Sequence, residues 1–162
     1  MTERRLLRVS LAGLASLAAA ALVGCGMTIP ADPDGTLDAV TGGELQVGIT
    51  HNPPSVDTGG QEPEGNEVAL VESFAASIDA SIVWTEGSEE ALVRMLEVGD
   101  LQLVIGGISD ATPWSSHAAV TRTYGEAVHA DGSTHGLVML APMGENAFLS
   151  ALERHLDEET AS

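Results

Sequence analysis

The sequence predicts an α/β protein, a three-layer sandwich built on a mainly parallel sheet. Short apolar segments typical of strands alternate along the chain with segments whose apolar residues recur every three or four positions. One strand segment, residues 101–105, is almost continuously apolar, as is typical of a strand buried on both faces. The composition, 44% hydrophobic and 19% charged, is that of a globular protein, so the chain should fold.

The first strand and the first helix are predicted from residue 44 onward. Residues 44–49 alternate between polar and apolar and break at Pro53-Pro54, as a strand followed by a rigid loop would. A helix should follow, with Gly65 or Asn66 as its cap. The apolar face of that helix would consist of Val68, Val71, Phe74, Ala75 and Ile78.

The alternation of strand and helix then continues. Residues 81–84 are typical of a second strand, and Ser88 opens a second helix that ends at Gly99-Asp100. The residues expected to point inward from it are Leu92, Met95, Leu96 and Val98. Residues 101–105 form a third strand, which we expect to stop at Gly106-Gly107. Right-handed crossovers would place the loops after these strands at one edge of the sheet, where open α/β folds bind ligands.

The C-terminal part is predicted to close the domain. We expect a loop at Thr112-Pro113-Trp114, an extended piece near residues 118–121, a strand over residues 135–140 and a final helix. Glu145 in the first turn of that helix would oppose the helix dipole favourably. Its core-facing stripe would consist of Phe148, Leu149, Leu152 and Leu156.

The N-terminal segment has the layout of a secretory signal peptide. Three arginines within residues 1–8 precede an apolar run, residues 9–23, that is too short to span a bilayer comfortably and has no charged stop-transfer sequence after it. The run ends in Leu22-Val23-Gly24-Cys25, which resembles the bacterial lipobox. That resemblance implies cleavage before Cys25 and attachment of lipid to its thiol. We therefore expect the protein to be held on the extracytoplasmic face of the cell membrane.

This layout divides the chain into four parts. Residues 1–24 are the signal peptide, and residues 25–43, rich in Pro, Asp, Gly and Thr, are expected to form a flexible tether. Residues 44–158 would form a single lobe, followed by a disordered tail, residues 159–162. The 138 residues from Cys25 onward are too few for two ordinary domains.

The chain is strongly acidic, with a formal net charge of −18 at pH 7. Removal of the signal peptide would leave three arginines and no lysine against 23 acidic residues. Such a surface repels nucleic acid and anionic lipid headgroups and attracts cations, so nucleic-acid binding is excluded. A well-hydrated surface suited to a salty or crowded exterior is the other interpretation of this charge.

The order of these elements resembles family 3 of the extracellular solute-binding proteins, the amino-acid-type binding proteins of ABC importers. The resemblance spans about residues 43–156 and implies one lobe of a type II periplasmic-binding-protein fold. The second lobe of the family is missing between Tyr124 and His135. The segments that carry the resemblance are 43–49 with Pro53-Pro54, the helix from Gly65 to Phe74-Ala75, 99–109, Thr112-Pro113, 121–124 and 136–142.

The candidate ligand-binding residues follow the predicted strands, at the loop edge of the sheet. They are Asn52, Pro53, Gly107, Ser109, Thr112, Trp114 and Arg122. The resemblance implies an aromatic residue where Ser55 stands and an arginine near Trp114 or Ser115 that clamps an α-carboxylate. This sequence has neither, and Arg122 is the candidate replacement. Ordinary turn chemistry would also explain the Gly, Pro, Ser and Asn residues, and Trp114 would serve equally well as a cover for the core.

The resemblance implies solute binding as an accessory to an ABC-type uptake transporter in the membrane. The alternative is a degenerate lobe that acts as a protein-interaction module on a membrane transporter and binds no small ligand. A third interpretation is a remnant without function. If micromolar binding corresponds to about −8 kcal/mol, one lobe supplying half of it would bind with roughly millimolar affinity. Self-association or a partner protein would then have to restore the enclosure.

Neither catalysis nor a cofactor is predicted. The sequence has no nucleophile elbow, phosphate loop or zincin motif, so we expect no enzyme activity. The five histidines are not spaced as metal ligands, and the only cysteine is the predicted lipidation site. We therefore expect no metal ion and no cofactor, and a small polar solute as the ligand.

Overall fold

The computed structural model describes residues 32–128 and 132–161. The predicted signal peptide, the predicted lipidation site Cys25 and the first part of the predicted tether lie outside the described residues. Across the two described ranges, no helix is both long enough and apolar enough to cross a membrane.

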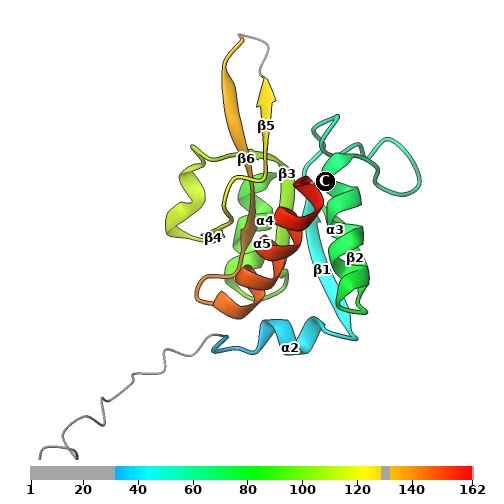
Figure 1. Ribbon diagram of the computed structural model, residues 1–162, viewed down its shortest axis with the longest axis vertical. Helices are drawn as coiled ribbons and strands as arrows, with labels where there is room; N and C mark the ends of the chain where they lie inside the picture. The colour runs from blue at the N-terminus through cyan, green and yellow to red at the C-terminus, as the bar shows by residue number, and fades with distance from the viewer. Residues whose placement is uncertain (1–31, 129–131, 162) are drawn as a thin grey trace, which may run out of the picture. The chain divides into compact units, whose positions relative to one another are not determined.

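A six-stranded sheet forms the middle of the fold (Figure 1). Its strands are β1 (Glu44–Ile49), β2 (Ser81–Glu86), β3 (Leu103–Ser109), β4 (Ala119–Val120), β5 (Gly125–Val128) and β6 (Thr134–Ala141). The spatial order is β2-β1-β3-β6-β4, and β5 also pairs with β6. β1 pairs in parallel with β2 and β3, whereas β6 runs antiparallel to β3, β4 and β5. The sheet is therefore mainly parallel in strand direction, as predicted.

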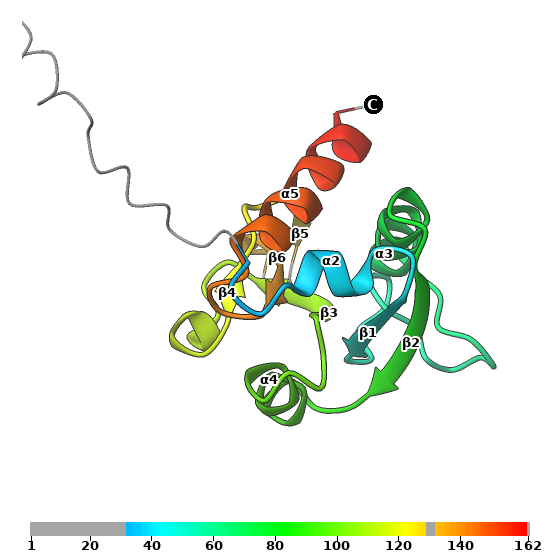
Figure 2. The same ribbon diagram turned by 90° about the horizontal axis from the view of Figure 1, so that it is seen from below.

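Helices cover both faces of this sheet, which confirms the three-layer α/β fold (Figure 2). One face carries α3 (Asn66–Ser77) and α5 (Asn146–Thr160), and the other carries α4 (Glu89–Glu97). β3 supplies both cores because successive side chains of a strand point to opposite faces: Ile105 packs with α3 and α5, whereas Val104 packs with α4. Because β3 is buried on both faces, residues 101–105 of the sequence are almost continuously apolar.

The predicted apolar faces of α3 and α5 meet above the sheet. Phe74 of α3 and Phe148 of α5 pack edge to face, with ring centroids 5.9 Å apart. Leu152 and Leu156 continue the α5 stripe into the same core, and both are buried. Periodicity therefore predicted these two helices and their inward faces correctly.

Two predictions about α4 and β3 were wrong. Val98 is 73% exposed, because α4 ends at Glu97 and Val98 no longer follows the helical period; Val93 is buried instead. β3 does not stop at Gly106-Gly107 but continues to Ser109. The two glycines adopt φ of 152° and 69°, which only glycine tolerates well, and the pairing of β3 with β6 shifts register there.

β5 was not predicted. It forms an antiparallel hairpin with β6, from Gly125 opposite Leu137 to Val128 opposite Thr134. Four residues are too few for a clear alternating pattern, so pairing with the longer β6 decides its conformation. The hairpin occupies the part of the chain where the family resemblance would place a second lobe.

The folded part of the chain begins before residue 44, the boundary that the sequence predicted. A short helix, α2 (Thr36–Val40), lies within the predicted tether and buries Val40 against the core. Asp32 accepts hydrogen bonds from the backbone N–H groups of Leu37 in α2 (2.7 Å) and Phe148 in α5 (3.2 Å). At the other end of the chain, α5 extends two residues into the predicted tail.

Glu145 completes the connection between α2 and α5. It is the N-cap residue of α5, but its buried carboxylate accepts hydrogen bonds from the N–H groups of Asp34 and Thr36, each at 3.0 Å. Asp32 and Glu145 thus satisfy the N-terminal donors of each other's helices. Burial tends to raise the pKa of Glu145, but these hydrogen bonds to its charged form prevail and the pKa lies below its usual value.

Candidate functional site

The candidate site is the carboxyl edge of the sheet, where the loops after β1 and β3 meet. The loop after β1 is held by two isolated bridges of its own, between Asn52 and Val56 and between Asp57 and Glu64. Gly65 then approaches this loop so closely that a Cβ on it would lie 2.3 Å from the carbonyl oxygen of Ser55. The carboxyl edge is therefore a compact loop surface.

A buried glutamate organises this edge. Glu67, in the first turn of α3, is 1% exposed, and its Oε2 accepts hydrogen bonds from the N–H groups of Gly106 (2.8 Å) and Gly107 (2.9 Å). Its Oε1 accepts a hydrogen bond from the hydroxyl of Tyr124. These bonds hold the turn within β3 and the start of the β5–β6 hairpin to the same side chain.

Burial dominates the electrostatics around Glu67. Desolvation raises the pKa of Glu67 above its usual value, although the hydrogen bonds from Tyr124, Gly107 and Gly106 favour the charged form and oppose that rise. Burial also raises the pKa of Tyr124, and the neighbouring carboxylate adds to the effect. Tyr124 is therefore a hydrogen-bond donor at neutral pH rather than an ionised group.

The structure brings Asn52, Pro53 and Gly107 together, as the sequence predicted for a shared edge. The side-chain amide of Asn52 donates to the carbonyl oxygen of Gly106 at 2.9 Å. A Cβ on Gly107, at a φ of 69°, would lie 2.2 Å from that amide nitrogen, so a larger residue would be strained and would displace the Asn52 side chain. Pro53 is exposed beside this contact. The amide of Asn52 and the N–H of Gly107 thus already have partners within the lobe.

Ser109 ends β3, Thr112 and Trp114 follow it, and the polar groups of all three form hydrogen bonds within the chain. The hydroxyl of Ser109 accepts from the N–H of Ala111 (3.1 Å), and that of Thr112 accepts from the N–H of Trp114 (3.4 Å), where the 3₁₀ helix η2 (Pro113–Ser116) begins. The indole N–H of Trp114 donates to Glu89 of α4 at 2.8 Å, and its ring packs on the core between α4 and the sheet. Trp114 is thus placed as a cover for this core.

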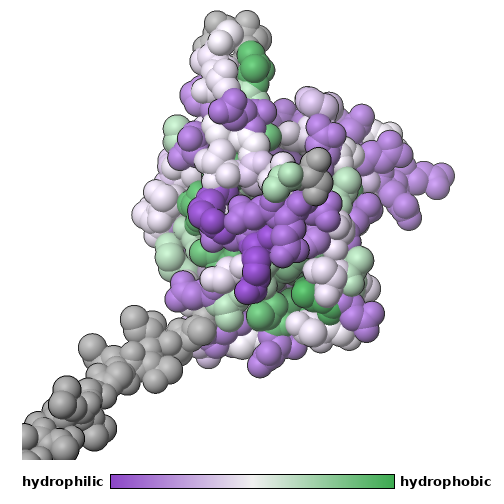
Figure 3. Space-filling model, in the orientation of Figure 1, coloured by the Kyte–Doolittle hydropathy of each residue, from purple (hydrophilic) through white to green (hydrophobic). Residues whose placement is uncertain are grey.

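Arg122 points away from the candidate ligand edge. Its guanidinium forms ion pairs with Glu153 (3.1 Å) and Asp157 (2.9 Å) of α5, and these carboxylates raise its pKa further. The backbone N–H of Arg122 also donates to Glu153, at 2.7 Å. Hydrophilic side chains gather over α5 on the face shown in Figure 3. The structure therefore places Arg122 on this acidic helix and not where a carboxylate clamp would stand.

Sequence reasoning missed Glu67 and Tyr124. A signal for Glu67 existed, because it stands four residues before Val71 and seven before Phe74 and so lies on the apolar face of α3. A carboxylate on such a face must be buried and needs partners. Tyr124 follows a polar stretch, and no periodic pattern of apolar residues around it indicates a buried partner. It meets Glu67 only because the folded chain brings it back beside α3.

Two further polar residues, Asp110 and Thr123, lie beside β6 of the β5–β6 hairpin. A Cβ on Gly136 of β6 would lie 3.0 Å from a carboxylate oxygen of Asp110 and 2.8 Å from the hydroxyl of Thr123, so these two groups flank that glycine. Both residues are exposed. The pair offers hydrogen-bond acceptors to a cationic group, and neither residue was predicted.

One cavity at the carboxyl edge is small. It has a volume of about 210 Å³, lies at the ends of β1 and β2 beside the loop after β1, and is lined by Thr58, Trp84 and Glu86 among others. Ligand pockets usually enclose about 300–1,000 Å³.

Among the described residues, no group of three or more His, Cys, Asp or Glu side chains is placed to hold a metal ion. His51 lies beside Asp57 and His117 beside Glu97.

Comparisons with known proteins identify the fold. No family model matches the sequence, and no curated protein matches it. Among solved structures, a point mutant of the arginine-bound form of domain 1 from TmArgBP superposes with a TM-score of 0.69 at 18% identity, covering 78% of this chain and 99% of that chain.

Two further structures agree with this match. An ancestral cationic amino acid solute-binding protein gives a TM-score of 0.67 at 12% identity, over 78% of this chain and 94% of that chain. A periplasmic binding protein of Salmonella typhimurium with high arginine specificity gives 0.64 at 11% identity, over 74% and 94%. The chain therefore has the fold of one periplasmic-binding-protein domain, as the sequence resemblance predicted.

Proposed function

We propose that this protein is a lipid-anchored, extracytoplasmic solute-binding-like protein, accessory to an ABC-type uptake transporter. The observation that carries the proposal is the match to domain 1 of TmArgBP, a single domain described as arginine-bound. One lobe of this architecture is thus able to hold a solute without its second half. Cys25, within its lipobox-like motif, would supply the anchor.

The solute that fits best is a small organic cation. The acidic charge of the lobe attracts cations, and Asp110 with Thr123 offers acceptors at the carboxyl edge. Arg122, which would be needed to clamp a carboxylate, is engaged with α5. Recognition would therefore act on an ammonium or guanidinium group. Because a single lobe encloses little of the ligand, we expect roughly millimolar affinity.

Titration calorimetry of the purified protein with arginine, lysine, choline and glutamate tests this function. We expect the cations to bind with millimolar dissociation constants, weakened at least about fivefold by Asp110→Asn, because that change removes the acceptor charge. Asp100→Asn, an exposed change before β3 at the opposite edge, is the control and should leave the affinity unchanged. Equal effects of the two variants, or tighter binding of glutamate, would contradict the proposal.

One observation favours a second function, an interaction module that binds no small ligand. Asn52, Gly107 and Arg122, three of the predicted ligand contacts, already have partners inside the lobe. If none of the solutes binds while the protein still associates with a membrane transporter, this second function is the correct one.

A further inference from the structure

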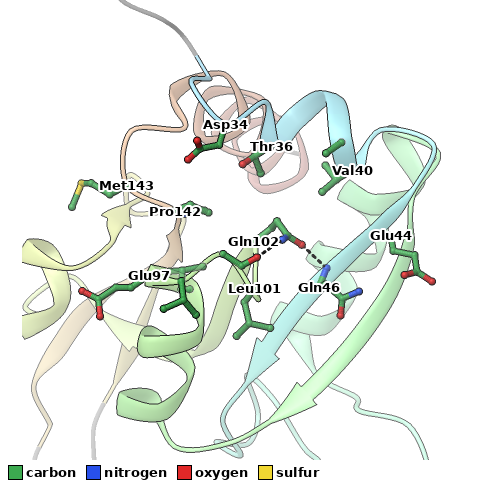
Figure 4. A pocket seen from close by; sticks show the side chains of 14 residues that line it. Asp34, Thr36, Val40, Glu44, Gln46, Glu97, Leu101, Gln102, Pro142 and Met143 are labelled. Atoms are coloured by element: carbon green, nitrogen blue, oxygen red, sulfur yellow. Dashed lines mark hydrogen bonds between the residues drawn. The ribbon is translucent and has the colours of Figure 1, made fainter.

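A cavity of about 550 Å³ opens at the amino edge of the sheet, opposite the Gly106-Gly107 turn (Figure 4). β1 and the segment before β3 form its floor, where the N–H of Gln46 donates to Gln102 at 3.0 Å. α2 borders the cavity on one side and the C-terminal end of α4 on the other. The cavity is large enough for a side chain or a short segment of another molecule.

Two exposed apolar side chains stand at this cavity. Val98 is 73% exposed and Met143 is 55% exposed, and they are two of the four exposed large hydrophobic residues in the described part of the chain. Both line the cavity, and the buried side chains of Leu96 and Leu101 lie behind its wall. Exposed apolar groups gathered around a concavity are typical of protein-binding sites.

The N-terminal connection brings this edge close to the membrane if Cys25 carries the proposed lipid anchor. Only residues 26–31 separate Cys25 from Asp32, which is hydrogen-bonded to both α2 and α5. Even fully extended, this connection reaches only about 25 Å. Asp34 and Thr36, two and four residues after Asp32, line the cavity. The first described residues of the chain therefore border the cavity.

The charge around the cavity indicates which neighbour fits there. Asp34, Glu44 and Glu97 line it, so anionic lipid headgroups would be repelled. A second copy of this acidic chain would be repelled for the same reason. A protein segment that carries an apolar side chain between basic residues would place the apolar group beside Val98 and Met143 and its charges beside the carboxylates.

We propose that this amino-edge cavity docks an extracytoplasmic segment of an integral membrane protein, with an apolar anchor residue and basic flanks. The proposal rests on the lipid anchor of the proposed function but not on solute binding. It assigns the two edges of the sheet to different partners, a solute at the carboxyl edge and a membrane protein at the amino edge.

Photo-crosslinking in intact cells with the full-length lipidated protein tests the docking. A photoreactive amino acid replaces Val98 or, as the matched control, Val128 of the β5–β6 hairpin, which is also 73% exposed. We expect at least tenfold more adduct from position 98, with a protein that resists carbonate extraction and whose attachment site maps to a basic extracytoplasmic segment. Glu44→Lys should reduce that adduct at least fivefold, whereas Glu126→Lys on β5 should not.

Several results would overturn the docking proposal. They are adducts only with lipid or with a second copy of the chain, equal labelling from positions 98 and 128, equal effects of the two lysine variants, and no adduct at all. Fractionation of the same cells tests the anchor separately. A protein that stays soluble with or without Cys25→Ser refutes the lipid anchor and the docking together, whereas a membrane-bound protein without a selective adduct refutes docking alone.

Discussion

The two edges of the sheet are built in different ways. At the carboxyl edge, Glu67 accepts hydrogen bonds from the N–H groups of Gly106 and Gly107, and Asn52 donates one to the carbonyl oxygen of Gly106. A Cβ on Gly107 would lie 2.2 Å from the side-chain nitrogen of Asn52. At the amino edge, a 550 Å³ cavity opens, and a Cβ on Gly99 would meet nothing within 4 Å. The Gly106-Gly107 turn, at the edge where open α/β folds usually bind ligands, is thus held by internal contacts, whereas the opposite edge keeps free space.

Glycine-to-alanine substitutions at the two edges should show this difference most strongly. Gly65→Ala, at the carboxyl edge, forces a Cβ to 2.3 Å from a backbone oxygen at a φ of 137°, so we expect a loss of about 4 kcal/mol in the free energy of unfolding. Gly99→Ala, at a φ of 85° with open space, should cost about 1 kcal/mol. Urea unfolding measures both, and equal losses would show that the carboxyl edge is not the more tightly packed.

Removal of Glu67 should have the next largest effect. Glu67→Ala leaves the N–H groups of Gly106 and Gly107 and the hydroxyl of Tyr124 without their acceptor, which we expect to cost about 2 kcal/mol. Urea unfolding of this variant, with Glu126→Ala as an exposed control, measures the loss. A loss no larger than that of the control would show that Glu67 does not hold the edge.

The raised pKa of Glu67 also predicts a pH dependence. Protonation of a group whose pKa is higher in the folded state stabilises the protein fully below the unfolded value, about 4.5, and this stabilisation disappears as the pH rises through the folded value. Relative to Glu67→Gln, the wild-type protein should therefore lose stability as the pH rises from about 4.5 through the folded-state pKa of Glu67. A constant difference across that range would contradict the burial of an ionisable carboxyl group.

Glu145→Gln should have the smallest effect and the opposite pH dependence. The pKa of Glu145 is lowered, so its contribution is present above about 4.5 and disappears as the pH falls through the folded value. We expect a loss of about 1 kcal/mol at pH 7 and faster hydrogen exchange in α2, with both differences vanishing in acid. Glu126→Gln on β5 is the control. Unchanged exchange in α2 would show that Glu145 does not hold this helix to the lobe.

Local patterns of apolar residues predicted most of the fold. Residues 44–49, the face of α3 and the stripe of α5 were all correct, because the period of burial follows directly from strand and helix geometry. The edge of the sheet that gathers Asn52, Pro53 and Gly107 also followed from the order of the elements. The predictions were wrong where the periodic pattern ends. Val98 lies beyond the end of α4 and is exposed, and β3 continues past its two glycines with a shift in register.

The amino-acid sequence by itself determined the α/β layers, the acidic surface and the absence of an arginine from the loop after β3. Only the tertiary structure decided that Glu67 meets Tyr124 57 positions away, that Glu145 reaches back to Asp34, and that Arg122 turns to α5. Side-chain periodicity is a local property of the backbone. The partner of a polar side chain depends instead on which distant segment the folded chain brings beside it, and no local pattern records that choice.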